Sequence, residues 1–182
     1  MVTKMVDLLL APGFEEVEAL TPADYLRRAG QEVRLVGVGS QVVTGSHGIT
    51  VHCDCIIEEA QELPDMLVLP GGMPGTRNLE KNAHVAKKIE DCCWGGKYVA
   101  AICAAPSILG HMGLLQGKRA TCFPGFEEAL QGAEYENASV VCDGNIITAK
   151  GAGAANQFAF ALVEALCGKE QADGLKAAVQ WE

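Results

Sequence analysis

Basic residues are scarce in this sequence. The 182 residues contain 14 lysines and arginines against 23 aspartates and glutamates, so the formal net charge is −9. No cluster of Lys or Arg stands out along the chain. An acidic chain without a basic patch is repelled by phosphate backbones, so we do not expect nucleic acid as a partner.

Long hydrophobic runs are also missing. A bilayer-spanning helix takes about 20 consecutive apolar residues, whereas the opening apolar run contains Asp7 and is soon followed by Glu15 and Glu16. The apolar run before Cys103 soon meets Pro106 and Ser107. We therefore expect no membrane association and a cytoplasmic location, where the eight cysteines would be free thiols rather than a disulfide framework.

The chain lacks low-complexity segments, linkers and internal repeats. Hydrophobic residues make up 49% of the sequence and charged residues 20%, which suits a single folded domain over 1–182. The glycine spacings GxGxxG and GxxxxGK[ST] are absent from the glycine-rich stretch LPGGMPGTRN, so a dinucleotide or P-loop site is not expected there.

What the sequence does contain is an alternation of short apolar runs with helix-like segments. Because the runs are continuous rather than alternating, both faces of each strand should be buried, as in a parallel sheet covered by helices. The predicted class is a doubly wound α/β domain. Strands are expected at 5–11, 32–38, 66–72 and 98–103, and two more at 139–149 around an Asp143-Gly144 turn. A hairpin or excursion is expected at 42–52, and helices at 22–30, 79–94, 104–113 and 153–168.

The stretch KYVAAICAAPSILG places Cys103 where a strand ends and a helix begins. A nucleophile elbow needs small residues two positions before and after the reactive residue, and here these are Ala101 and Ala105. Free N–H groups at a helix start would favour the thiolate. The alternative is a buried structural cysteine, since cysteine is among the most buried residue types.

Two further loops follow strands and should meet Cys103 at the carboxyl edge of the sheet. GFEEVE supplies Glu15, Glu16 and Glu18 at a helix start, where acids also complement the helix dipole. LPGG supplies Gly71 and Gly72, which either make a tight turn or present a backbone N–H to an oxyanion. The spacing alone leaves open which acid reaches the thiol.

Together, the motifs GFEEVEALTPADYLRRAG, LVLPGG, AAICAAP and FALVEALCGKE resemble the ThiJ/PfpI superfamily, in its DJ-one branch. This resemblance implies a flavodoxin-like fold, a homodimer and no cofactor. It also implies a nucleophilic role for Cys103, with Glu18 as its acid and the backbones of Gly72 and Ala104 as oxyanion donors. Glyoxalase III-like action on 2-oxoaldehydes such as methylglyoxal is the implied activity, and deglycase action on early glycation adducts is a further one.

The sequence departs from the family pattern in its histidines. Ala104 stands where protease-like members have a histidine, and Phe123 stands where relatives carry one in a T-x-H-P context. His111 lies eight residues along the elbow helix, about 12 Å away. His47 replaces an arginine and would line the pocket, from the partner subunit in a dimer. A Cys–Glu pair is therefore favoured over a Cys–His dyad.

Two alternatives to an enzyme remain at this stage. Cys103 could serve as a peroxide sensor that stops at the sulfinic acid, with or without a stress-chaperone role, or the site could be an inactive binding module. A metal site in HGITVHCDC is disfavoured because in a strand Cys53 and Cys55 share one face while His52 points to the other.

Overall fold

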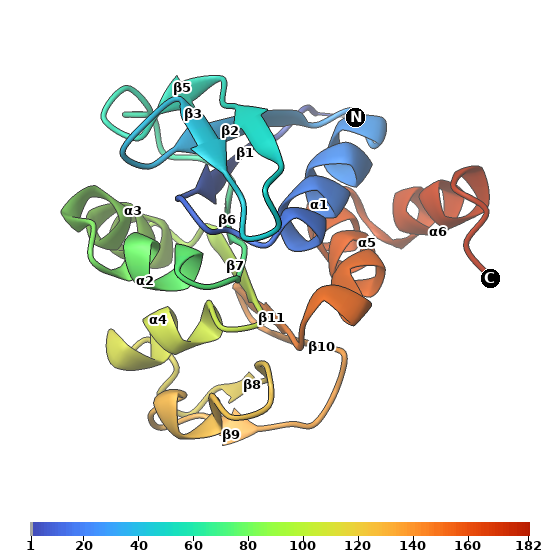
Figure 1. The fold of residues 1–182 in the computed structure, drawn as a ribbon. Helices are drawn as coiled ribbons and strands as arrows, with labels where there is room; N and C mark the ends of the chain where they lie inside the picture. The colour runs from blue at the N-terminus through green and yellow to red at the C-terminus, as the bar shows by residue number, and fades with distance from the viewer. Residues whose placement is uncertain (1) are drawn as a thin grey trace.

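The computed structural model describes residues 2–182. Seven strands form a central sheet in which every neighbouring pair is parallel except β10 and β11 (Figure 1). The flavodoxin-like α/β class is thereby confirmed. In sheet order the strands are β10 (Val140–Asp143), β11 (Ile146–Ala149), β7 (Tyr98–Ile102), β6 (Met66–Leu69), β1 (Met5–Leu10), β2 (Glu32–Gly37) and β5 (Cys55–Ile56).

Two layers of helices sandwich this sheet. Val6, Leu8 and Leu10 of β1 face one layer, and Leu9 faces the other, because successive side chains of a strand point to opposite faces. The first layer consists of α1 (Glu16–Arg28), α5 (Ala155–Cys167) and α6 (Lys169–Ala178). The second consists of α2 (Gly75–Glu80), α3 (Ala83–Trp94) and α4 (Pro106–His111).

The strand order reverses at β1, which pairs with β2 on one side and with β6 on the other. In open α/β sheets, ligands bind in the crevice beyond the carboxyl ends of the strands at this switch point. The loops after β1 and β6 therefore flank the expected site, and β7 ends beside them because it pairs with β6.

Smaller elements complete the fold. The predicted hairpin is confirmed as β3 (Val42–Thr44) paired antiparallel with β4 (Thr50–His52). The short strands β8 (Arg119–Ala120) and β9 (Glu134–Tyr135) form a separate parallel pair. There are also two 3₁₀ turns. The first, η1 (Glu127–Ala129), lies between β8 and β9, and the second, η2 (Ala152–Ala154), directly precedes α5.

Three helix predictions were wrong in extent. The single helix expected over 79–94 is two helices, because the Asn82 side chain accepts hydrogen bonds from the N–H groups of His84 and Val85 and so starts α3 anew. Helix α1 begins before the predicted segment, at Glu16, and passes through Pro22. Helix α4 is shorter than predicted, and α6 was not anticipated.

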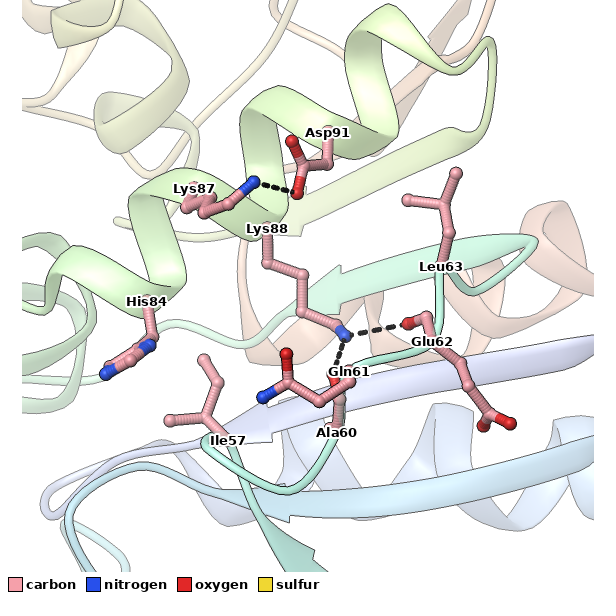
Figure 2. A pocket seen from close by; sticks show the side chains of 9 residues that line it. All are labelled: Ile57, Ala60, Gln61, Glu62, Leu63, His84, Lys87, Lys88 and Asp91. Carbon is pink, nitrogen blue, oxygen red and sulfur yellow. Dashed lines mark hydrogen bonds and ion pairs between the residues drawn. The ribbon is translucent and has the colours of Figure 1, made fainter.

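A charged cluster is buried beneath α3. Asp7 is fully buried on β1 and accepts two hydrogen bonds from Arg34. It also forms an ion pair with Lys88, whose Nζ lies 2.9 Å from Asp7 Oδ2. The Lys88 ammonium also donates to the carbonyls of Ala60 (2.6 Å) and Glu62 (3.1 Å), beside a small hollow of about 110 Å³ (Figure 2). All three Lys88 protons have acceptors, so this cluster joins α3 to the sheet rather than offering a free cation.

Among residues 2–182, no helix is both long and apolar enough to cross a membrane. This agrees with the absence of long apolar runs in the sequence.

Candidate active site

Cys103 follows β7 directly and adopts φ = +66°, a left-handed conformation that only Gln180 shares among the non-glycine residues 2–182. Holding a residue there costs on the order of 1–3 kcal/mol and is characteristic of functional turns. Two hydrogen bonds fix the turn: Cys103 N–H donates to the Ala149 carbonyl, and Phe123 N–H donates to the Cys103 carbonyl, both at 2.9 Å. Cys103 therefore occupies a strained strand-to-helix elbow, as its small neighbours predicted.

The loop after β6 approaches the elbow closely because it consists of glycine. A Cβ on Gly71 would lie 2.6 Å from both the Cys103 Cβ and Glu18 Oε2. Gly72 has φ = +91°, and a Cβ there would lie 2.4 Å from the Glu15 nitrogen. These two positions leave no room for a side chain, so the Gly72 N–H can be directed at the Cys103 sulfur.

Glu18 reaches this point from the first turns of α1. Its side chain is fully buried, and Oε2 accepts a hydrogen bond of 2.9 Å from the Gly71 N–H. The second oxygen, Oε1, has no hydrogen-bond partner of ordinary geometry. Burial raises the pKa of Glu18 to about 7, against the lowering influence of the neighbouring Cys103 thiol, and the charge of Glu15 adds to the rise. A carboxyl with this pKa can both accept and donate a proton near neutral pH.

The Cys103 thiol differs from the prediction in its acidity. Burial, together with the charge and hydrogen bonding of Glu18, raises its pKa to about 12, whereas the N–H groups of Ala104 and Gly72 lower it by less. The two backbone donors act in the predicted direction, but burial, together with the neighbouring carboxyl, outweighs them. The expectation that N–H groups at the elbow favour the thiolate gives the right direction for their effect, but it left out the loss of water and the neighbouring carboxyl, which raise the pKa of the thiol.

Both pKa values are raised chiefly by burial, and the two groups lie in direct contact. Such a pair titrates as a unit. When Glu18 carries the proton, the like charge beside the sulfur disappears, so the state with a thiolate and a neutral carboxyl becomes accessible. The protonation state of Glu18 therefore governs the acidity of the Cys103 thiol.

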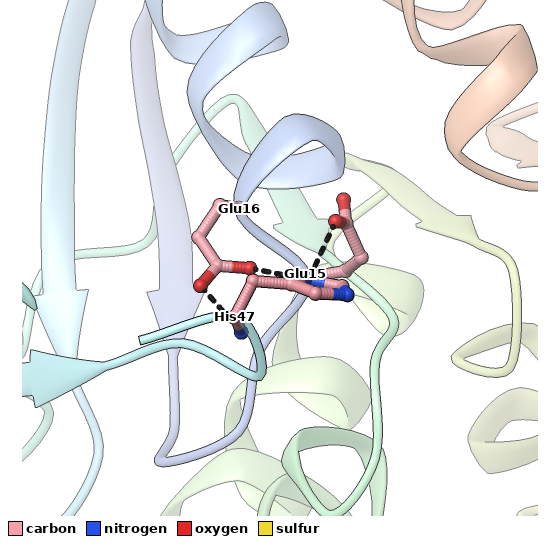
Figure 3. A group of neighbouring side chains, drawn as sticks. All are labelled: Glu15, Glu16 and His47. Carbon is pink, nitrogen blue, oxygen red and sulfur yellow. Dashed lines mark hydrogen bonds and ion pairs between the residues drawn. The ribbon is translucent and has the colours of Figure 1, made fainter. Parts of the chain in front are cut away.

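Glu15, Glu16 and His47 form a neighbouring group at the start of α1 (Figure 3). Glu15 caps the helix, since its Oε2 accepts from the Glu18 N–H at 2.9 Å. Glu16 is buried and binds the hairpin turn: it accepts from the N–H groups of His47 (2.8 Å) and Ile49 (3.3 Å). Burial alone would raise its pKa, but these N–H groups hold the pKa of Glu16 below its ordinary value.

His47 contacts both glutamates of its own chain, with its Nδ1 3.1 Å from Glu16 Oε2 and 3.4 Å from Glu15 Oε1. Of the described residues, this trio is the only group of three or more His, Cys, Asp or Glu side chains whose ligand atoms lie within 4.8 Å of one another. A metal there would compete with the hydrogen bonds by which Glu16 holds the hairpin. His52 and Cys53 do not join it.

The histidine of the elbow helix, His111, does not face Cys103. His111 is paired with Glu80 of α2, as its distance along the elbow helix predicted. Phe123 lies next to the elbow through its bond to the Cys103 carbonyl. Its ring is about half exposed and borders a hollow whose other wall includes Gly151 and Ala154.

This second wall was missed at the sequence level. The glycine and alanine run that follows the strand at 146–149 was its only signal, because a small-residue run after a parallel strand lies at the carboxyl edge of the sheet.

The comparisons with known proteins decide the family. The DJ-1/PfpI family profile matches residues 4–165. The chain belongs to this family. It is 39% identical to "Protein DJ-1 homolog B" of Arabidopsis thaliana over 93% of this chain, although it spans only 40% of that relative. It is also 38% identical to a deglycase of Pyrococcus abyssi over 79% of this chain and 87% of the relative.

Solved structures agree with this assignment. A C103A variant of a DJ-1 superfamily protein from Salmonella typhimurium superposes with a TM-score of 0.95 at 35% identity, covering 99% of this chain and 100% of the other. The DJ-1 branch inferred from GFEEVE, LPGG and AAICAAP is thereby confirmed.

Proposed function

We propose that this DJ-1/PfpI protein is a cofactor-independent cysteine enzyme acting on 2-oxoaldehydes such as methylglyoxal. The observation that carries the proposal is the elbow itself: a strained Cys103 whose sulfur receives the N–H groups of Gly72 and Ala104 and adjoins the buried Glu18. Deglycase-named relatives support chemistry on carbonyl adducts.

The reaction needs no external oxidant. The Cys103 thiol adds to the aldehyde carbon and forms a C–S bond, while its proton passes through Glu18 to the oxygen of the resulting hemithioacetal. The N–H groups of Gly72 and Ala104 stabilise that oxygen while it is negative. Glu18 then removes the hydrogen from the same carbon as a proton and returns it to the neighbouring carbonyl carbon. The hydroxyl proton of the first carbon passes to the oxygen of the second, so the first carbon is oxidised to a thioester carbonyl, the second is reduced to a carbinol, and a hydroxyacyl thioester remains.

Water completes the cycle by cleaving the C–S bond of the thioester. The products are a 2-hydroxy acid and the free thiol, so methylglyoxal yields lactate. A glycated thiol or amine is a hemithioacetal or hemiaminal of the same aldehyde. Its C–S or C–N bond would break first: the hydroxyl proton leaves, Glu18 protonates the departing thiol or amine, and the aldehyde that this regenerates is then attacked by Cys103. General acid–base assistance of this kind contributes on the order of 10²–10⁴ in rate.

The test is turnover of methylglyoxal to lactate without added metal, glutathione or nucleotide. Cys103→Ala should abolish it, and Glu18→Gln should reduce it by at least ~100-fold. His111→Ala is the matched control and should retain turnover, since His111 pairs with Glu80. Full activity in Glu18→Gln, or loss of activity in His111→Ala, would show that the proton-transfer role belongs to another residue.

A second candidate function is peroxide sensing by the same thiol. It is favoured by the Glu18 carboxyl, whose Oε1 lacks a partner and could hydrogen-bond an oxidised sulfur. Two equivalents of hydrogen peroxide would convert the thiol to the sulfinic acid and release two waters. Intact-mass analysis should then show two added oxygens on Cys103. A disulfide to another cysteine would contradict this alternative, and absence of oxoaldehyde turnover would favour it over the enzyme.

We further propose a homodimer that works in the cytoplasm. Val17 of α1, Val42 of β3 and Ile49 of the hairpin turn are each about half exposed, and an apolar surface of this kind suits a partner subunit. All eight cysteines are free thiols, as a reducing compartment requires.

A further inference from the structure

A hollow of about 400 Å³ lies beside the elbow. Its walls come from two segments, one around Phe123 and one at 150–154, and each segment is hydrogen-bonded to the backbone of Cys103 at or next to the wall. The Phe123 N–H donates a hydrogen bond to the Cys103 carbonyl, and the Cys103 N–H donates one to the carbonyl of Ala149. Ala149 directly precedes the wall formed by Lys150–Ala154. A group attached to the carbon bound by Cys103 could therefore extend into this hollow.

The volume is far larger than methylglyoxal needs. Pockets of roughly 300–1,000 Å³ hold drug-sized ligands, whereas the substituent of methylglyoxal is a single methyl group. Bound methylglyoxal would therefore leave most of the wall of the hollow exposed to water.

The wall is largely apolar, and its largest side chain is Phe123. The ring is 47% exposed, so a ligand can still cover part of it. Gly151 lies against one edge of the Phe123 ring, where a Cβ would come within 3.2 Å of Phe123 Cδ2, so a larger residue there would crowd the ring. The charged residue of the lining, Lys150, donates to Asn137 Oδ1 at 2.6 Å. Covering exposed aromatic surface with an apolar group is favourable.

We propose that Phe123 is a specificity-determining residue and that the site prefers 2-oxoaldehydes with a bulky, aromatic substituent over methylglyoxal. This inference rests on the proposed function for the reaction, but the preference itself is a property of the hollow. A substituent such as phenyl would lie against the Phe123 ring while its aldehyde carbon bonds Cys103.

Binding can be measured independently of turnover. Mandelamide and lactamide are uncharged, unreactive analogues of the phenyl and methyl products, and both can be titrated into Cys103→Ala protein by ligand-observed NMR. Mandelamide should bind at least ~10-fold more tightly, in the range that one apolar group gains in a pocket. A second change, Phe123→Ala, should remove most of the preference, whereas Trp94→Ala, which deletes an exposed aromatic residue of α3, should keep it. Equal affinity for the two amides, or a preference that survives Phe123→Ala, would overturn the inference.

Turnover provides the second readout. The ratio of kcat/KM for phenylglyoxal, which yields mandelate, to that for methylglyoxal should exceed ~10 in the unmodified protein. Phe123→His keeps a ring of similar size but makes it polar, and should move this ratio toward one. An unchanged ratio would contradict the role of Phe123. If neither aldehyde is converted, the proposed function fails, and the amide affinities alone decide whether Phe123 sets a preference.

Discussion

Glu18→Gln should make the protein more stable at alkaline pH while it removes the general base. The pKa of Glu18 is raised from 4.5 to about 7 because the carboxyl is buried. For an acid with a raised pKa, the folded state loses stability as pH rises from the unfolded pKa through the folded one. A difference of about 2.5 pKa units corresponds to about 3 kcal/mol at pH 8.

The amide should fit the site in the place of the neutral acid. Its oxygen can accept the Gly71 N–H as Oε2 does, and its NH₂ group would occupy the position of the unpartnered Oε1. The variant therefore keeps the hydrogen bond and never carries the buried charge. Its free energy of unfolding should exceed that of the unmodified protein by about 2–3 kcal/mol at pH 8, and the two should converge near pH 5.

Urea unfolding at both pH values, with a reductant present for the eight cysteines, measures this difference. Glu90→Gln changes an exposed glutamate of α3 and serves as the matched control, with no pH-dependent gain expected. A Glu18→Gln protein whose stability relative to the unmodified protein is the same at pH 5 and pH 8 would refute the raised pKa and, with it, the proton-shuttling role.

Three further outcomes follow from the described contacts. In Glu18→Gln, Cys103 should be alkylated faster at pH 7 even though turnover falls, because the carboxylate is among the causes that raise the thiol pKa. Alkylation rates with iodoacetamide, assigned to Cys103 by peptide mapping, measure this effect. An unchanged rate would show that the carboxylate does not raise the thiol pKa. Gly71→Ala should lower turnover at least ~10-fold, since its Cβ would lie 2.6 Å from the Cys103 Cβ. A displacement of a catalytic group by about 1 Å can reduce the rate 10²-fold. Kinetics like those of the unmodified protein would show that the loop at Gly71 can shift without displacing Cys103. Lys88→Met should destabilise the fold by about 3 kcal/mol while leaving relative substrate preference unchanged, because Asp7 loses one of its buried partners; urea midpoints equal to those of the unmodified protein would argue that Arg34 alone suffices.

The sheet was predictable because its signal is local. Runs such as Leu8–Leu10 and Leu67–Leu69 are wholly buried, and burial on both faces leaves a continuous apolar run in the sequence. The elbow was predictable for the same reason, since the small residues that it needs adjoin Cys103 in the chain.

The features that were missed depend on contacts between distant segments or on a choice between two local structures. Asn82 could have continued a helix or capped a new one, and only the fold shows that it caps. The hollow joins Phe123 to Gly151, and no short-range pattern connects them. The raised thiol pKa likewise arises from burial by the fold and from Glu18, which is distant in sequence.

The left-handed backbone of Cys103 has an evolutionary consequence. Glycine is the residue that adopts φ = +66° without strain, so replacing the cysteine by glycine would relieve the turn while destroying the nucleophile. The proposed nucleophile thus occupies a position where inactivation costs the fold little or even stabilises it. Selection for folding alone would erode this thiol, and its retention in a lineage requires continued selection for the chemistry it performs.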